Sequence, residues 1–320
     1  MNVIRGDDTG GDLVGSPDLS VPTQVHVIGI GGAGMSAIAE VLSTMGHGIS
    51  GSDLKASAGL ERLRALGVEV HVGHDAAQVG SAEYVTRSTA VPDSNPECLR
   101  ALEEGRPLLS RAQMLGAITR LRRTVAVAGT HGKTTTASML ALALRGADLR
   151  PSFVIGGDVN EIGTGAAWDD GDLFVVEADE SDGSFLELAP RLAVVTNVDP
   201  DHLEHHGSFE ALRASFDRFA GGVDGPVVIG IDDAEGAALA DRARRAGVDV
   251  RTVGTAVDAD WSIEELRESW EGVDFVLRGP TIASDPGLSV TLPVPGLHNA
   301  RNAASAAVLA LLVGADPDSV

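Results

Sequence analysis

The sequence is poor in cysteine and in aromatic residues, and each shortage excludes something. Cys98 is the only cysteine among 320 residues, so no disulfide can form within the chain. A single thiol with no matching histidine motif is typical of a small buried side chain rather than of a nucleophile. Aromatic residues make up only 3%, so aliphatic side chains must fill the core that a 43% hydrophobic composition allows.

Positive charge is also scarce, since 24 Lys and Arg stand against 46 Asp and Glu, for a formal net charge of −22. Such an excess repels polyanions, which argues against nucleic acid and anionic membranes as partners. No apolar run approaches the roughly 20 residues of a transmembrane helix, and the N-terminus lacks the apolar segment of a signal peptide. We therefore expect a cytoplasmic protein that binds any anionic ligand through a local positive site.

Short β-branched runs alternate with helical patterns along most of the chain, which predicts an α/β protein built on parallel sheets. Residues 1–22 are polar and are expected to form a disordered leader. Residues 23–122 are expected to form a Rossmann-like domain and residues 123–320 a P-loop ATP-binding domain, with the basic connector at residues 120–123 marking the boundary. A glycine-rich loop opens each domain, which suggests two separate nucleotide-type sites.

The first glycine loop, GIGGAG, follows the strand-like run VHVI and precedes a helical pattern. The pattern G-x-G-x-x-G in this context lets backbone N–H groups approach a diphosphate at a helix N-terminus. Asp53 ends the next predicted strand, where an acidic residue often binds a ribose hydroxyl. The loop does not distinguish NAD, FAD and a UDP-sugar, so an NAD-dependent oxidoreductase is one candidate.

The second glycine loop, GTHGKTT, follows the strand-like run TVAVA. Its Gly129 and Gly132 lie closer together than the glycines of the common phosphate-binding pattern G-x-x-x-x-G-K-[ST]. The glycines still free the backbone to curl around phosphate oxygens. Lys133 supplies a cation for the β- and γ-phosphates, and the Thr134 hydroxyl is placed to ligate Mg²⁺. The loop therefore predicts ATP with magnesium, which an NAD enzyme does not need.

Two acidic segments follow predicted strands of the second domain. Glu177 ends the run DLFVVE and opens the segment EADESDGSF, while Asn197, Asp199 and His202 follow the run LAVVT. Ligands of doubly wound sheets bind at the carboxyl ends of strands, and phosphoryl transfer needs groups that hold a metal ion. These residues are therefore candidates for a metal site beside the phosphate loop.

Together these motifs resemble the Mur ligase family, the ATP-dependent amino-acid ligases of peptidoglycan synthesis. The similar segments span roughly residues 25–303 and include VHVIGIGGAGMSAIAEVL, GTHGKTTT, EADESDGSF, TNVDPDHLEHHG and PGLHNARNA. The shortened GTHGKTT loop is that family's form of the phosphate loop. Within the family, the segments are most similar to members that join L-alanine to UDP-N-acetylmuramate.

The resemblance implies a role for each motif. The first domain would hold UDP-N-acetylmuramate, without using NAD, through Gly31, Gly32, Gly34, Asp53 and Ser88. The residues that would bind ATP are Gly129, Thr130, His131, Gly132, Lys133, Thr134 and Thr135, with Asn299 on the adenine. The ligands of Mg²⁺ or Mn²⁺ would be Thr134, Glu177 and His202. The catalytic residues would be Lys133, Glu177 and His202.

The implied reaction is a carboxylate–amine ligation. The substrate carboxylate would attack the γ-phosphate to give an acyl phosphate, and the amine of L-alanine would then displace inorganic phosphate. Lys133 and the metal ions would offset the repulsion between two anionic reactants. The family's C-terminal domain, which closes over ATP, has no counterpart in this sequence, so we expect a fragment that binds the UDP-sugar but ligates weakly alone. Leu297 also replaces the Arg usual in the family, which removes one expected polar contact.

Three other functions stay open on the sequence. A ligase that recycles a tripeptide onto the same UDP-sugar shares both glycine loops, although the segment SDGSF is more similar to the alanine ligase. An NAD-dependent oxidoreductase explains the first loop but not the second. A non-catalytic nucleotide sensor would keep both sites without the reaction.

Overall fold

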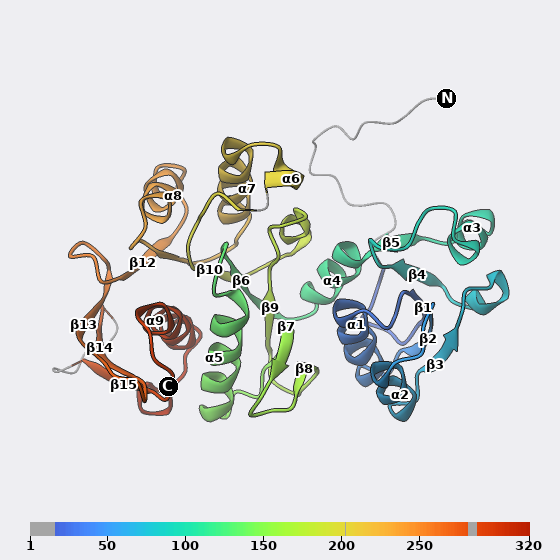
Figure 1. The fold of residues 1–320 in the computed structure, drawn as a ribbon, viewed down its shortest axis with the longest axis horizontal. Coiled ribbons are helices and arrows are strands. Elements are labelled where there is room, and N and C mark those ends of the chain that lie inside the picture. Colours follow the sequence, from blue (N-terminus) through green and yellow to red (C-terminus); the bar gives the residue numbers. More distant parts are fainter. Residues whose placement is uncertain (1–16, 202, 281–286) are drawn as a thin grey trace.

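The computed structural model describes residues 17–201, 203–280 and 287–320, and these form two sheets that divide the chain into a first and a second unit (Figure 1). The first sheet is wholly parallel, with the strand order β3-β2-β1-β4-β5. Its strands are β1 (Gln24–Ile28), β2 (Gly48–Asp53), β3 (Glu69–Val72), β4 (Tyr84–Arg87) and β5 (Leu108–Ser110). The helices of the first unit are α1 (Ala33–Thr44), α2 (Ala58–Ala65), α3 (Pro96–Glu103) and α4 (Arg111–Thr119).

The second sheet has ten strands in the order β15-β14-β13-β12-β11-β10-β6-β9-β7-β8. Its parallel centre consists of β6 (Arg123–Ala128), β7 (Ser152–Val159), β9 (Leu173–Glu177), β10 (Leu192–Val195), β11 (Val227–Gly230) and β12 (Val250–Gly254). Antiparallel pairs close both edges through β8 (Thr164–Ala167) at one side and β13 (Trp261–Glu268), β14 (Val273–Arg278) and β15 (Leu288–Leu292) at the other. The sheet is therefore mixed rather than purely parallel.

Helices cover both faces of the second sheet, so its central strands are buried on both sides. Along β6, Val125 and Val127 pack on one face with α5 (Lys133–Gly146) and α9 (Leu297–Leu312). Ala126 and Ala128 pack on the other face, which carries α7 (Phe209–Gly221) and α8 (Ala234–Arg245). Two short helical segments, η2 (Ser184–Glu187) and α6 (Leu203–His206), lie near α7.

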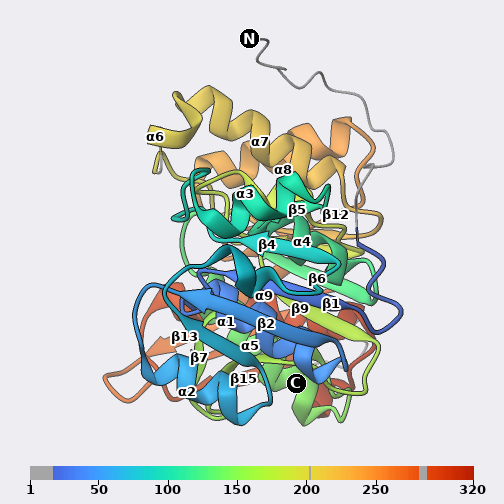
Figure 2. The ribbon, with the colours of Figure 1, turned by 90° about the vertical axis from the view of Figure 1, so that its right-hand side faces the viewer.

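The two units share one continuous apolar core. A single cluster contains Ile38 of α1 and Ile118 of α4 together with Val154 of β7 and Val176 of β9. The first unit therefore turns α1 and α4 toward the second, and Figure 2 views the molecule from the side of the first unit. This packing sets how the carboxyl ends of the two sheets face each other.

A buried polar network lies between the first sheet and α3. The Glu97 carboxylate is fully buried, accepts a hydrogen bond from Ser52 Oγ at 2.6 Å, and lies 3.2 Å from His74 Nδ1. His26, also fully buried, lies 3.7 Å from the same oxygen. Burial raises the pKa of Glu97, but the nearby His26, the hydrogen bond from Ser52 and the nearby His74 outweigh it, so its pKa lies below the usual value.

Candidate active site

The second glycine loop connects β6 to α5 at the centre of the second sheet. Gly129 has φ +127° and Gly132 has φ +82°, in the region that favours glycine. A side chain at Gly129 would also place its Cβ 2.8 Å from the backbone nitrogen of Thr196. The loop therefore depends on glycine both for its turn and for its close approach to the neighbouring strand β10.

Residues that follow β10 hold this loop by hydrogen bonds. The His131 N–H donates to Asn197 Oδ1 at 2.9 Å, and Asn197 Nδ2 donates to the His131 carbonyl at 2.9 Å. The Asp199 N–H donates to Thr130 Oγ1, also at 2.9 Å. Asn197, a sequence candidate for the metal site, therefore has a clear role in fixing the loop backbone.

Lys133 does not extend into solvent but folds back over its own loop. Its Nζ donates to the carbonyls of Gly129, at 2.8 Å, and Thr130, at 3.2 Å. It also lies 2.8 Å from the carboxylate of Glu180, whose side chain is only 1% exposed. Burial raises the pKa of Glu180, and the nearby Lys133 charge offsets this only in part. The sequence placed Glu180 in an acidic segment but gave no sign of this pairing.

Thr134 and Glu177, two of the predicted metal ligands, lie next to each other. The Thr134 hydroxyl lies 3.0 Å from Glu177 Oε1, and the Gly156 N–H donates to Glu177 Oε2 at 2.7 Å. His202 lies outside the described residues, and among those described no three His, Cys, Asp or Glu side chains gather to hold a metal. A hydroxyl and one carboxylate still fit Mg²⁺, because this ion usually completes its shell with substrate phosphates and water.

The first glycine loop is bordered by residues from three neighbouring strand ends. The Gly31 N–H donates to Asp53 Oδ2 at 2.9 Å, so Asp53 fixes the loop from the end of β2. Ser88 follows β4, and its Cβ would lie 3.0 Å from a side-chain carbon added at Gly29. At Gly34, an added Cβ would lie 2.7 Å from Nε of Arg111, which begins α4 directly after β5. Gly32 lies between them, its N–H donating to the Gly29 carbonyl at 3.2 Å.

Arg111 supplies a positive group at this loop, which neither glycine motif predicts. The available signal was its place in RAQML, directly after the predicted strand PLLS, because ligands gather at the carboxyl ends of parallel strands. An arginine there suits a diphosphate or a carboxylate, both of which it can bind through two parallel hydrogen bonds.

A cavity of about 290 Å³ lies between the first glycine loop and the end of β9 in the second unit. It is lined by Gly34 and Arg111 from the first unit and by Gly156, Glu177 and Asp179 from the second. Burial raises the pKa of Asp179, but hydrogen bonds from Ser181 and the charges of Lys133 and Arg111 bring it below its usual value. The cavity thus places the first loop and the metal candidate Glu177 around one space, which we call the substrate cavity.

A second cavity, of about 250 Å³, lies between the phosphate loop and α9. We call it the nucleotide cavity; its polar lining includes His131, Asn197, Asp232, His298, Arg301 and Asn302, and Arg301 Nε donates to Asp232 Oδ2 at 2.5 Å. Asn299, predicted to contact adenine, is not among the lining residues, and its side chain donates to the Pro295 carbonyl at 2.7 Å. The lining residues recur at helical spacing, 298, 301, 302 and 305, a periodicity that the sequence already contained.

Of the other ATP candidates, Thr135 lies in the first turn of α5, directly after Thr134. The thiol of Cys98 is buried, and burial raises its pKa, which agrees with an unreactive cysteine. None of the helices in the described part of the chain is long and apolar enough to cross a membrane.

Comparison with known families covers both units. Residues 127–310 match the Mur ligase middle domain, and residues 24–123 match a model described as the Mur ligase family, catalytic domain. The chain belongs to the Mur ligase family.

Curated relatives of this Mur ligase include two alanine ligases. It is 46% identical over 295 residues to the UDP-N-acetylmuramate–L-alanine ligase of Thermobifida fusca, covering 92% of this chain and 62% of that protein. It is 43% identical over 302 residues to the enzyme of the same name from Brucella ovis, covering 92% and 63%. The chain thus spans about three fifths of the length of these relatives.

Solved structures share the fold over 93% of the chain. The UDP-N-acetylmuramate–alanine ligase MurC of Thermotoga maritima has a TM-score of 0.78 at 30% identity, with 66% of that chain covered. The UDP-N-acetylmuramate:L-alanyl-gamma-D-glutamyl-meso-diaminopimelate ligase of Neisseria meningitides has a TM-score of 0.81 at 29% identity, with 96% of that chain covered. Both likenesses confirm the α/β fold with a Rossmann-like unit followed by a phosphate-loop unit.

Proposed function

We propose that this Mur ligase chain carries the UDP-N-acetylmuramate site and the MgATP site of a cytoplasmic ligase that adds L-alanine in peptidoglycan precursor synthesis. The observation that carries the proposal is the substrate cavity, in which the first glycine loop and Arg111 face Glu177. A sugar nucleotide held at the first loop could extend its carboxylate toward the phosphate loop across this one space.

In this proposal the first unit binds and orients the sugar nucleotide. The N–H groups of the loop at Gly32 and Gly34 would approach the diphosphate, helped by the N-terminus of α1. Asp53 keeps the loop in shape through Gly31, and Ser88 borders it. Arg111 would place one positive charge between the diphosphate and the reacting carboxylate.

The second unit would bind ATP and activate the carboxylate. Thr134 and Glu177 would hold Mg²⁺, which supplies positive charge to phosphate oxygens when bound. Lys133 would exchange part of its contact with Glu180 for phosphate oxygens and offset the repulsion between carboxylate and ATP. The carboxylate would then attack the γ-phosphorus with ADP as the leaving group, and the alanine amine would displace phosphate from the acyl phosphate. The nucleotide cavity offers Arg301 and Asn302 for the base and ribose.

The tripeptide-recycling ligase is a second candidate for a specific reason. The similar structure from Neisseria meningitides, named for a peptide in place of alanine, covers as much of the chain as the alanine ligase structure does. The identity of 46% to an alanine ligase favours alanine. An NAD-dependent oxidoreductase leaves the paired Thr134 and Glu177 without a role.

Carboxylate activation can be tested by trapping the acyl phosphate. The chain is incubated with MgATP, UDP-N-acetylmuramate and hydroxylamine, and the hydroxamate of the sugar nucleotide is measured by mass spectrometry. The proposal predicts a hydroxamate that requires both ATP and Glu177, with Glu177→Gln as the control. L-Alanine or the tripeptide, supplied in place of hydroxylamine, separates the two ligase candidates by which amide forms. A chain that binds both substrates but yields no hydroxamate would contradict the proposed activation.

A further inference from the structure

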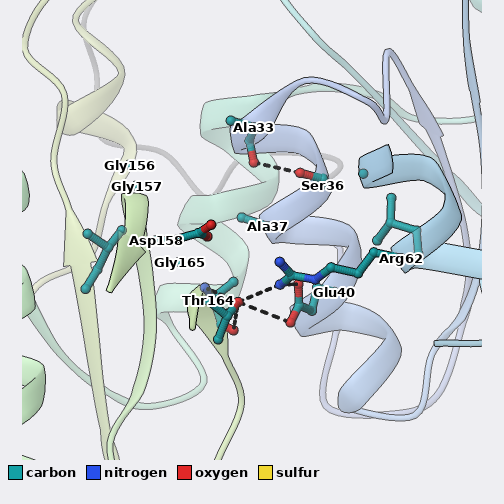
Figure 3. Close-up of a pocket in the computed structure, with 14 residues that line it drawn as sticks. Ala33, Ser36, Ala37, Glu40, Arg62, Gly156, Gly157, Asp158, Thr164 and Gly165 are labelled. Atoms are coloured by element: carbon teal, nitrogen blue, oxygen red, sulfur yellow. Dashed lines mark hydrogen bonds and ion pairs between the residues drawn. The ribbon is translucent and has the colours of Figure 1, made fainter. Parts of the chain in front are cut away.

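Next to the substrate cavity lies a smaller cavity of about 120 Å³, between α1 and α2 of the first unit and the β7–β8 hairpin of the second (Figure 3). The two cavities share Ala33, Ile155 and Gly156 in their linings, so they form neighbouring parts of one groove between the units. At the far end of this groove, polar side chains from both units meet.

Arg62 of α2 makes the link between the units. Its Nη2 donates to Thr164 Oγ1 of β8 at 2.6 Å and lies 2.5 Å from Glu40 Oε2 of α1. Thr164 Oγ1 also lies 3.5 Å from the other oxygen of Glu40, which closes a triangle of contacts (Figure 3). We call these three residues the Arg62 clamp. The Glu40 side chain is 17% exposed and that of Arg62 is 45% exposed, so the clamp stands at the edge of the groove.

The elements that the clamp joins are those that position the two substrates. Helix α1 begins at Ala33 and contains Gly34, the last residue of the first glycine loop, so a shift of α1 moves the diphosphate site. The β7–β8 hairpin contains Gly156, whose N–H holds Glu177 at 2.7 Å. The width of the groove at the clamp therefore affects the distance between the diphosphate loop and Glu177.

The units are also joined elsewhere, by close backbone packing. A Cβ at Gly116 of α4 would lie 2.4 Å from the Glu187 carbonyl of η2, and the Ala189 N–H donates to Thr119 Oγ1 at 3.3 Å. Beside the clamp, α1 also packs on β7 and β8, with Ile38 and Val154 in one buried cluster. The clamp adds the polar contact at this edge of the groove, and that contact depends on the Arg62 guanidinium.

We propose that Arg62, Glu40 and Thr164 act as positioning residues that couple binding of the sugar nucleotide to binding of MgATP. The clamp holds the groove at one width, and at this width the binding of one ligand increases the affinity for the other. This inference rests on the proposed function, because it takes the ligands of the two loops from it. A partly exposed charge-assisted contact of this kind changes the coupling by about threefold to fivefold.

The test measures how much the binding of one ligand increases the affinity of the chain for the other. The dissociation constant of UDP-N-acetylmuramate is determined by calorimetry, with and without magnesium and a non-hydrolysable ATP analogue. In the unaltered chain the analogue should tighten binding. Thr164→Val, which keeps the shape but removes the hydroxyl, should lose about threefold to fivefold of that enhancement while each ligand alone binds as before. Thr164→Ser should keep the enhancement, and Arg62→Met should lose it as Thr164→Val does.

The other possible results would contradict the clamp, or the proposed function together with the clamp. Full enhancement in Thr164→Val, or an equal loss in Thr164→Ser, would overturn the clamp. An unaltered chain that binds both ligands without mutual enhancement would also overturn it and leave the proposed function standing. Failure of the unaltered chain to bind UDP-N-acetylmuramate would overturn the proposed function and this inference with it. Thermal unfolding of each variant shows whether a lost enhancement comes from misfolding.

Discussion

Replacing Lys133 with methionine should destabilise the fold as well as remove the ammonium group. The Glu180 carboxylate is 1% exposed and lies 2.8 Å from Lys133 Nζ, so its charge is tolerated largely because of that pairing. Without the ammonium, Glu180 must either keep a buried charge that is less well compensated or take up a proton. We therefore expect Lys133→Met to lower the free energy of unfolding at neutral pH.

Protonation sets the size of this effect. A carboxyl with an unfolded-state pKa of 4.5 that must stay protonated at pH 7 costs about 3.4 kcal/mol, because each pH unit contributes about 1.36 kcal/mol. This is the upper limit of the effect, because the pKa of Glu180 is raised even beside Lys133. At pH 5 the same reasoning leaves a cost of about 0.7 kcal/mol. The sign follows from proton binding: the folded variant binds more protons than the unfolded chain between 4.5 and the raised pKa of Glu180, so stability falls as pH rises through that window.

Urea unfolding of four proteins tests this reasoning at both pH values: the unaltered chain, Lys133→Met, Glu180→Gln and the double variant. The double variant should regain most of the stability at pH 7, because a neutral amide needs no counter-charge. It should still fail to bind ATP tightly, because the ammonium is absent. If Lys133→Met is as stable as the unaltered chain at pH 7, or if the double variant is no more stable than Lys133→Met, the pairing does not have the role given to it here.

Three further predictions follow from the described contacts. Gly129→Ala should lower stability by about 1–3 kcal/mol and abolish ATP binding, because the residue has φ +127° and no room for a Cβ; thermal unfolding and calorimetry measure both. Glu97→Gln should lower stability by about 1–3 kcal/mol at pH 7, because the fully buried carboxylate is held by Ser52 and His74 and the amide disturbs these contacts. Since the pKa of Glu97 is lowered, its contribution is present above 4.5 and is lost as pH falls through the folded-state pKa, so unfolding of Glu97→Gln should depend less on pH below 4.5. Asn302→Ala should weaken ATP binding about tenfold in a fluorescence titration and Asn299→Ala much less, because only Asn302 lines the nucleotide cavity; equal effects would contradict this placement.

The parallel strands and both glycine loops could be predicted from the sequence because their signals are local. A β-branched run followed by a glycine turn and a helical pattern appears within about twenty residues of sequence. The sequence does not predict β8, whose run TGAA lacks β-branched residues apart from one threonine and forms only by pairing with β7. Nor does it predict β13, because WSIEELRE alternates poorly and exposes five consecutive residues.

In the candidate site, too, contacts with a local sequence signal could be predicted and contacts that depend on packing could not. Thr134 and Glu177 could be predicted to meet because they end or follow strands that are neighbours in a parallel sheet. The pairing of Lys133 with Glu180 could not, because it depends on which of several acidic residues the chain buries after β9. Arg111 and the Arg62 clamp depend on how the two units pack, which no pattern within either unit records.

Calorimetric titration of the chain with UDP-N-acetylmuramate, with NADH as the matched control, tests the central claim most directly. The account predicts binding of the UDP-sugar in the micromolar range or tighter, weakened by Arg111→Met, and no binding of NADH. Binding of NADH in place of the UDP-sugar would contradict the role given to the first glycine loop and would make a dinucleotide-dependent enzyme the better description.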